Sequence, residues 1–484
     1  MSSLPALLVA APLLGSVLAL LAGLVRSETG WPVALVTAAV QVAGAGVLAS
    51  RAFDGTVSYV VGGFTAPFGI ELVVDGLSAT IALLVAVVSL AVLAYSRVAG
   101  PRTNAFYAVY LLLVAGLTGM SITGDVFNMY VFLEITGLAA YALVASGEGG
   151  RSARAALKYL IVGTVGASLF LLGIGYAFVA TGTLNMADLS TQLAAVGYTE
   201  PLVQAAFALL VVGLFVKVAV FPLHAWQPDA YAGSPDSVSA LISALVSTVA
   251  AYALIRIVFT VFTVDFLQAN PVARSLLVAG AIVSIVFGSV LAVSQTEIKR
   301  MLAYSSVSQF GLVVGAVAVA NETALIGATV HLVGHAVMKG GLFLTAGLIA
   351  TATGAQTVDD YEGLIQRLPL GAGAFGLLAL AMVGVPPAVG FVGKWYIALG
   401  AVEAAAWPLA VVILLSTLLT LAYFARILER MFFRDASGER VAVDGVSPGM
   451  TGVVVAAALA AVVLGMLAFE YGQLLEPTVQ ALLS

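Results

Sequence analysis

Long apolar runs recur along the chain from residue 4 to residue 469, and short polar segments separate them. A helix that crosses a bilayer needs about 20 apolar residues, because each residue rises by about 1.5 Å. The pattern therefore predicts an all-α polytopic membrane protein. Fourteen spans fit, at 4–25, 31–50, 75–98, 105–122, 123–145, 155–180, 201–232, 237–262, 271–294, 299–320, 324–351, 370–398, 406–428 and 450–470.

Two of these runs, the seventh and the twelfth, are longer than one straight helix requires and contain prolines. Pro222 lies within 201–232, and the pair Pro386 and Pro387 lies within 370–398. Proline removes a backbone donor and clashes with the preceding turn, so we expect both helices to be broken. Broken backbone at membrane depth is tolerated only inside protein or beside water, which favours an ion pathway. The simpler interpretation is two kinks that only shape the packing.

The composition supports the bilayer as the solvent of this chain. Of its 484 residues, 62% are hydrophobic and 9% are charged, with a mean hydropathy of +1.11. The absence of cysteine excludes disulfides, thiolate zinc sites and cysteine-ligated iron–sulfur clusters. Neither a Gly-rich phosphate loop nor a basic nucleic-acid patch is apparent, so we expect no cofactor and no nucleic acid. We interpret the N-terminal run as a first membrane helix and not as a cleaved signal.

The basic residues test the number of spans and indicate an orientation. With the N-terminus outside, the even-numbered loops hold only Arg51 and Arg274. A miscounted helix would scramble such a positive-inside bias, so we expect both termini outside the plasma membrane. The odd-numbered loops and adjoining helix ends hold thirteen basic residues: Arg26, Arg97, Arg102, Arg151, Arg154, Lys158, Lys299, Arg300, Arg367, Arg426, Arg430, Arg434 and Arg440.

A few charged residues remain inside the spans. Glu134 lies near the middle of NMYVFLEITGLAAYALVA (128–145), and Lys217, Lys339 and Lys394 are also deep. Charged groups inside a membrane are costly and usually functional, and we expect Glu134 to pair with Lys217 as a protonation switch. A permanent ion pair that only joins helices is the alternative. Arg256 is expected near the outer end of its helix, where it can snorkel.

A second cluster is HLVGHAVMKGG (331–341), in which His331, His335 and Lys339 follow at intervals of four and share one helix face. A proton relay through imidazole and water suits these residues. Core histidines bonded to neighbouring helices, or a metal site without a further ligand motif, are the weaker alternatives. His224 lies beside the first break, where it could join the path or satisfy freed backbone groups.

Five motifs resemble the antiporter-like membrane subunits of respiratory complex I, membrane-bound hydrogenases and Mrp-type cation/proton antiporters. The resemblance spans roughly residues 75–430, and GDVFNMYVFLE is most similar to the Mrp D subunit. The motifs are TGDVFNMYVFLEITGLAAYALVASG, VKVAVFPLHAWQPDAYAGSPDSVSALISALV, KRMLAYSSVSQFG, HLVGHAVMKGGLFLTAG and GVPPAVGFVGKW.

The resemblance implies fourteen helices, of which 4–8 and 9–13 form two inverted five-helix repeats with helices 7 and 12 broken. The implied divisions are peripheral helices 1–3 (1–104), the first repeat (105–262), the second repeat (263–432), and a loop with helix 14 (433–484).

The resemblance also implies roles for single residues. Glu134 and Lys217 would form the first half-channel, and Lys394 would belong to the second. His331, His335 and Lys339 would form a central hydrophilic axis between them. One departure is Thr248, which occupies the position where the family usually carries lysine or histidine on helix 8. A threonine can hold water there but cannot store a proton.

These observations lead to one preferred function and several alternatives. The preferred function is a proton-translocating subunit of a multisubunit Mrp-type Na⁺(K⁺)/H⁺ antiporter, with other membrane subunits as partners and no redox chemistry in this chain. The first alternative is a proton-pumping membrane-arm subunit of a complex I-like NADH:quinone oxidoreductase or a membrane-bound hydrogenase. A structural subunit that has lost transport and a solitary transporter of another family are weaker alternatives.

Overall fold

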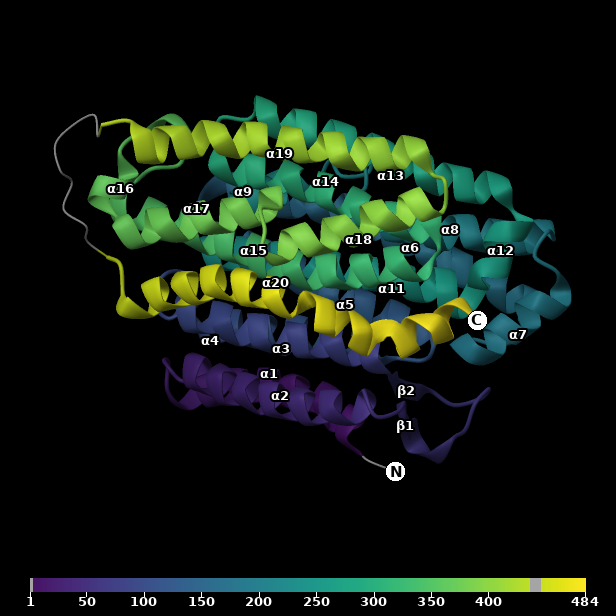
Figure 1. The fold of residues 1–484 in the computed structure, drawn as a ribbon. Coiled ribbons are helices and arrows are strands. Elements are labelled where there is room, and N and C mark those ends of the chain that lie inside the picture. The colour runs from purple at the N-terminus through teal and green to yellow at the C-terminus, as the bar shows by residue number, and fades with distance from the viewer. Residues whose placement is uncertain (1–2, 436–444) are drawn as a thin grey trace.

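The computed structural model describes residues 3–435 and 445–484. Arg440 and part of the expected loop before the last helix therefore lie outside the described residues. The long helices lie side by side, roughly along one direction, and both chain ends lie at the same end of this bundle (Figure 1). We call the opposite end, where α5 joins α6 and α13 joins α14, the inner end.

The first three spans and a small hairpin precede the central helices. The hairpin pairs its strands antiparallel, with Val57 opposite Val74, and the sequence pattern did not indicate it. Figure 1 shows α1 and α2 side by side at the edge of the bundle. The elements are α1 (Leu4–Val25), α2 (Gly30–Ala52), β1 (Val57–Val60), η1 (Val61–Gly63), β2 (Glu71–Val74) and α3 (Gly76–Ser96).

Five spans then form a first set, and the fourth of them is interrupted. The fifth is one continuous helical segment of 34 residues that contains two π-helical stretches. The elements are α4 (Asn104–Ile122), α5 (Val126–Ala145), α6 (Gly149–Thr181), the short α7 (Met186–Val196), α8 (Pro201–Val218) with α9 (Gln227–Gly233), and α10 (Asp236–Leu241), η2 (Ile242–Val246), α11 (Ser247–Arg256), η3 (Ile257–Phe262) and α12 (Thr263–Ala269).

A second set of five spans follows, and again the fourth is interrupted. A last helix, α20 (Pro448–Leu483), ends 13 residues beyond the expected position 470. The elements of the second set are α13 (Pro271–Ser294), α14 (Ile298–Val319), α15 (Glu322–Thr353), the short η4 (Asp359–Tyr361) and α16 (Leu364–Arg367), α17 (Pro369–Val383) with α18 (Val389–Glu403), and α19 (Trp407–Phe433).

The fourteen expected spans are confirmed. Thirteen helices of the described residues are long and apolar enough to cross a membrane, and the broken pair α17 and α18 supplies the fourteenth. Because each set has an odd number of spans, the second set begins at the membrane face opposite to the first. The two sets are therefore inverted relative to each other, as expected for this fold class.

Both breaks fall at the prolines that predicted them. α8 ends at Val218 and is followed by Ala219, whose φ of 67° is left-handed, and the non-helical segment beyond it contains Pro222. α17 ends at Val383 and is followed by Gly384, which has a φ of 100° and lies before Pro386 and Pro387. A left-handed residue after a helix is a common way to stop it. Each break exposes the C-terminal carbonyl groups of a half-helix inside the protein.

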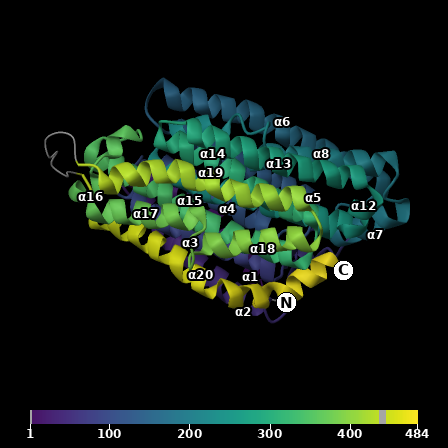
Figure 2. The same cartoon turned by 45° about the horizontal axis from the view of Figure 1, so that its top comes forward.

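The buried centre consists of the continuous fifth span of the first set together with α14 and α15. Nearly all residues in these helices are buried, whereas α1, α2 and α20 expose apolar side chains on their outer faces. Figure 2 shows α15 below α19, near the middle of the bundle. Titratable side chains on the central helices are therefore shielded from lipid by the surrounding spans.

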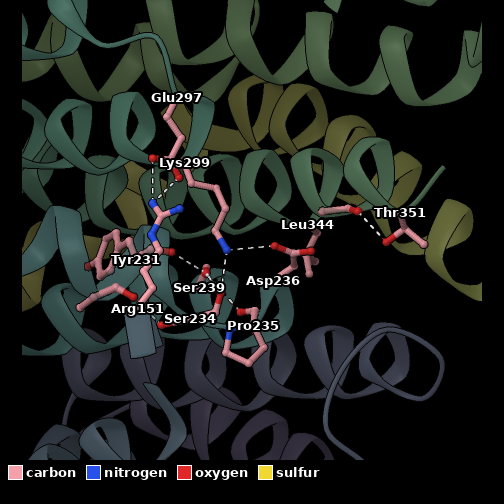
Figure 3. Close-up of polar contacts among 12 residues, drawn as sticks. Arg151, Tyr231, Ser234, Pro235, Asp236, Ser239, Glu297, Lys299, Leu344 and Thr351 are labelled. Carbon is pink, nitrogen blue, oxygen red and sulfur yellow. Dashed lines mark hydrogen bonds and ion pairs between the residues drawn. The ribbon is translucent and has the colours of Figure 1, made fainter. Parts of the chain in front are cut away.

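Ion pairs fix the inner end of this centre (Figure 3). Arg151 donates to both carboxylate oxygens of Glu297, at 2.5 and 2.7 Å. Lys299 donates to the backbone oxygen of Ser234 at 2.7 Å and to Asp236 at 2.9 Å. These contacts join the start of α14 to α6 and to the turn between α9 and α10. The second half of the first broken span is thereby held against the second set of helices.

Candidate functional site

The structure brings Glu134 of α5 and Lys217 of α8 close together. The ammonium nitrogen of Lys217 lies 3.9 Å from Glu134 Oε1 and donates a hydrogen bond of 3.2 Å to the Tyr141 hydroxyl. The Lys217 side chain is 6% exposed and that of Glu134 is 28% exposed. The lysine therefore stands between a carboxylate and a phenol that lie on the same helix, two turns apart.

Aromatic side chains hold this arrangement in place. The ring of Tyr159 contacts Tyr141 edge to face and stacks on Trp226, with centroids 4.6 and 3.9 Å apart. Trp226 in turn donates its indole hydrogen to the backbone oxygen of Val216 at 2.9 Å. These contacts connect α5 and α6 to the segment that follows the break, around Lys217. The carbonyl of Val216 at the end of α8 accepts its hydrogen bond from Trp226 and does not depend on the lysine.

His224 and Thr248 lie in the interior near this pair. His224 belongs to the non-helical segment between α8 and α9, and its ring stacks on Phe221 at 5.0 Å. Thr248 is on α11, which contacts both α8 and α14. Within residues 3–435 and 445–484, neither His224 Nδ1 nor the Thr248 hydroxyl has a hydrogen-bond partner.

α15 carries His331, His335 and Lys339, and all three are at most 1% exposed. Lys339 donates to the backbone oxygen of Leu302 at 3.1 Å and to the Ser305 hydroxyl, both on α14. The two histidine rings lie 6.3 Å apart. No ring nitrogen of either histidine has a hydrogen-bond partner among the residues that the structure describes.

Lys394 is on α18, just after the second break. Its ammonium group donates to the backbone oxygens of Met382 and Val383, at 2.8 and 3.1 Å. These are the last carbonyl groups of α17, where the negative end of a helix dipole favours a cation. The preceding residue, Gly393, lets α18 approach α15, because a Cβ there would lie 2.9 Å from His331 Cα. Lys394 therefore follows directly on a close contact with the histidine helix.

These residues follow one another across the protein interior. α8 contacts α11, α11 contacts α14, α14 contacts α15, and α15 contacts α18. Buried polar atoms almost always have a partner, and the unpaired atoms of Thr248, His331 and His335 can find one in water. We call the set of Glu134, Lys217, Thr248, His331, His335, Lys339 and Lys394 the polar row.

One expectation about a charged residue was wrong. Arg256 does not snorkel to the surface; it is 7% exposed and bonded to the Asp75 carboxylate and, at 2.8 Å, to the Ser78 hydroxyl. Tyr252 accepts a further hydrogen bond from it at 2.9 Å. A buried guanidinium that is paired with a carboxylate costs less free energy than an unpaired one among apolar side chains. Asp75 also caps α3 at Ser78, as expected of an acid before a helix.

The charge of Arg256 affects the pKa of Asp75, which lies before the start of its span. Burial alone would raise the pKa of this carboxyl. The charge of Arg256 and the hydrogen bonds from Arg256 and Ser78 outweigh burial and lower the pKa below its usual value. Asp75 is therefore ionised in the neutral pH range, and the pair is a fixed structural link.

Sequence reasoning also did not single out Tyr141. Its position seven residues after Glu134 places both side chains on one face of α5, and this spacing was the available signal. Among the described residues, no group of three or more histidine, aspartate or glutamate side chains could hold a metal ion. The polar row itself contains carboxyl, amine, imidazole and hydroxyl groups, and groups of these kinds inside a membrane can exchange protons.

The fold and the polar row define a polytopic helical membrane protein with interrupted helices beside buried titratable groups. Residues 123–420 match the NADH:quinone oxidoreductase/Mrp antiporter transmembrane family, and the chain belongs to this family.

The relatives to which the chain is similar include both oxidoreductase subunits and antiporter subunits. The chain is 48% identical to the N subunit of the NADH-quinone oxidoreductase of Desulforudis audaxviator over 78% of its length and 75% of that protein. It is 34% identical to the D subunit of the Na(+)/H(+) antiporter of Bacillus subtilis over 81% and 79% of the two chains. A chain of the membrane-bound sulfane sulfur reductase, an archaeal respiratory membrane complex, superposes with a TM-score of 0.93 at 31% identity, covering 100% of this chain and 98% of that chain.

Proposed function

We propose that this chain carries protons across the membrane as one subunit of a hetero-oligomeric membrane complex, through Glu134, Lys217, His331, His335, Lys339 and Lys394. The observation that carries this proposal is the position of the Lys217 ammonium group, buried between the Glu134 carboxylate and the Tyr141 hydroxyl. A permanent structural pair would gain from a short, direct salt bridge. A gap of 3.9 Å instead leaves the lysine free to exchange partners.

The proposed step couples the two charges. While Glu134 is ionised, its charge favours the protonated form of Lys217. When Glu134 takes up a proton, this attraction ends and the lysine gives its own proton to the interior. The receiving groups are water molecules held by Thr248, His224 and the unpaired histidine nitrogens of α15. Lys339 and Lys394 then pass the proton on towards the second break.

The driving force that we propose is exchange with a monovalent cation, Na⁺ or K⁺, as in Mrp-type antiporters. The similarity to the D subunit of a Na(+)/H(+) antiporter supports this choice. A redox-driven complex is the second candidate, and the 48% identity to the N subunit of an NADH-quinone oxidoreductase, together with the archaeal respiratory complex, supports it. The proteins that copurify with the chain discriminate between the two: quinone-site and iron–sulfur subunits favour the second candidate.

Proton flux in vesicles that contain the whole complex tests the proposed path. Lys217→Ala and Glu134→Ala are expected to abolish coupled flux while the subunits still assemble. Glu403→Ala is a matched control, because Glu403 is an exposed carboxyl on α18 outside the polar row. Near-normal flux in either test variant, or an equal loss in the control, would refute the assigned roles.

We further propose that both termini lie outside the cell membrane. Because the chain has no cysteine, single cysteines report their own side without background. Ser3→Cys and Ser484→Cys are expected to react with a membrane-impermeant thiol reagent in intact cells. Gly150→Cys, at the inner end, is expected to react only after permeabilisation, and the reverse pattern would invert the orientation.

A further inference from the structure

A pocket of about 640 Å³ opens at the inner end, where the start of α6, the half-helix α9 and the start of α14 meet. Its lining is strongly unbalanced in charge. One carboxylate, Asp229, faces four basic side chains: Arg151, Arg154, Lys158 and Arg300. The proton path described above does not use this pocket.

Ion pairs fix three of the four basic side chains in position. Asp229 accepts hydrogen bonds from Lys158 at 2.6 Å and from Arg300 at 2.7 Å, so one carboxylate holds two cations. Arg151 is paired with Glu297 outside the pocket. Arg154 has no hydrogen-bond or ion-pair partner in the part of the chain that the structure describes. The pocket thus keeps a positive charge that its own residues do not neutralise.

The face of α6 below the pocket is apolar and turned outward. Arg154 begins a stripe of exposed residues at helical spacing, and apart from Ser168 the members that follow are hydrophobic. From Arg154 to the last of them the helix advances by about 27 Å, close to the hydrocarbon thickness of a bilayer. The members are Leu157, 56% exposed, Ile161 and Val165, each 55% exposed, and Leu172, 50% exposed.

We propose that this pocket binds the phosphate headgroup of an anionic phospholipid, whose acyl chains lie along the apolar stripe of α6. Guanidinium groups form paired, charge-assisted hydrogen bonds with phosphate oxygens, and Arg154 and Arg300 supply them. Basic pockets at the inner face are suited to anionic headgroups. A free phosphate would contact only the basic residues of the pocket, whereas the acyl chains of a lipid would also contact the apolar stripe of α6. The headgroup contacts α9, the half-helix that follows the first break.

The test uses the full-length protein in detergent and does not depend on transport. Native mass spectrometry measures retention of phosphatidylglycerol against phosphatidylcholine, and thermal unfolding measures the stabilisation that each lipid gives. Wild type is expected to prefer phosphatidylglycerol. Arg154→Gln is expected to weaken its binding by about tenfold or more and to leave phosphatidylcholine binding unchanged. Arg154 is exposed, so its replacement leaves the buried packing intact.

The control variant removes the same charge from another inner loop. Arg26→Gln lies between α1 and α2, away from the pocket, and is expected to retain full phosphatidylglycerol binding. If Arg26→Gln and Arg154→Gln lost phosphatidylglycerol binding equally, the binding would depend on the overall charge of this face and not on the pocket. That result would overturn the proposal. It would also be overturned if inorganic phosphate at equal concentration displaced the lipid, or if wild type did not distinguish the two headgroups.

Discussion

The two interrupted spans each place a buried lysine beside a break, but the two lysines have different partners. Lys217 lies in the last turn of α8, before its break, and contacts the side chains of Glu134 and Tyr141. Lys394 lies after its break and donates to two backbone carbonyl groups at the end of α17. Both sets of helices therefore have a lysine beside the break, but the groups that the two lysines contact are different.

This difference indicates different tasks for the two lysines. A carboxylate can gain or lose a proton, so the environment of Lys217 can change its charge. Backbone carbonyl groups cannot, so the contacts of Lys394 remain constant unless the half-helices move. No carboxylate of the described residues lies within ion-pair distance of Lys394. We infer that Lys217 responds to the protonation of a neighbour and that Lys394 also stabilises the broken backbone.

Replacing each lysine by methionine gives the largest expected effect and tests this comparison directly. Both variants are expected to lose coupled proton flux in vesicles. Lys394→Met is expected also to lower the unfolding temperature, because each buried carbonyl left without a donor costs about 1–3 kcal/mol. For Lys217→Met the fall is smaller, since Trp226 still satisfies the carbonyl of Val216. Equal unfolding temperatures in the two purified variants would contradict the structural role of Lys394.

Glu134→Gln tests the electrostatic half of the comparison. Two unit charges about 4 Å apart interact by about 4 kcal/mol at an effective dielectric constant of about 20, and part of this is lost when the carboxylate is replaced. We expect flux to fall by about a hundredfold and its pH dependence to flatten, because Lys217 then has no carboxylate beside it. A pH profile of flux, measured against wild type, checks this. An unchanged profile would remove Glu134 from the switch.

Tyr141→Phe is expected to have a smaller effect. It removes one hydrogen bond to Lys217 but keeps the ring that packs on Tyr159. A hydrogen bond to a charged group contributes about 1.5–3 kcal/mol, so a loss of about tenfold in flux is expected. Tyr159→Phe serves as the control, since it leaves the contact between Tyr141 and Lys217 in place. If both variants lost flux equally, the loss could not be assigned to the hydrogen bond between the Tyr141 hydroxyl and Lys217.

The sequence was sufficient to predict the spans, the two breaks and the intramembrane acid and lysines, because apolar length, proline and isolated charge are local signals. The partners of Lys394 were not predictable, since they are backbone atoms that any residue supplies. Arg256 and Asp75 are 181 positions apart, and nothing local marks them as a pair. The π-helical stretches beside α11 depend on hydrogen-bond register and have no clear signature in composition.

Thr248 lies on α11, between the helix of Lys217 and the second set of helices. Replacing it is expected to change proton flux less than any of the substitutions above. Its hydroxyl is fully buried on α11 and has no hydrogen-bond partner within the described ranges. Thr248→Val keeps the shape of the side chain and removes its ability to hold water, so we expect flux to fall by a few-fold, about the value of one weak hydrogen bond. Vesicle flux measures this, with Thr420→Val on α19 as the control for a buried threonine outside the polar row.

Thr248→Lys extends the same test by placing a group that can store a proton between Lys217 and α15. If water on Thr248 bridges the halves, the new amine is expected to change both the rate and the pH dependence of flux, because it binds the proton more tightly than water does. If flux is unchanged in Thr248→Val and in Thr248→Lys, position 248 is not on the path. The proton would then have to reach His331 or His335 from Lys217 by way of α14, whose Gln309 side chain is also buried without a partner among the described residues.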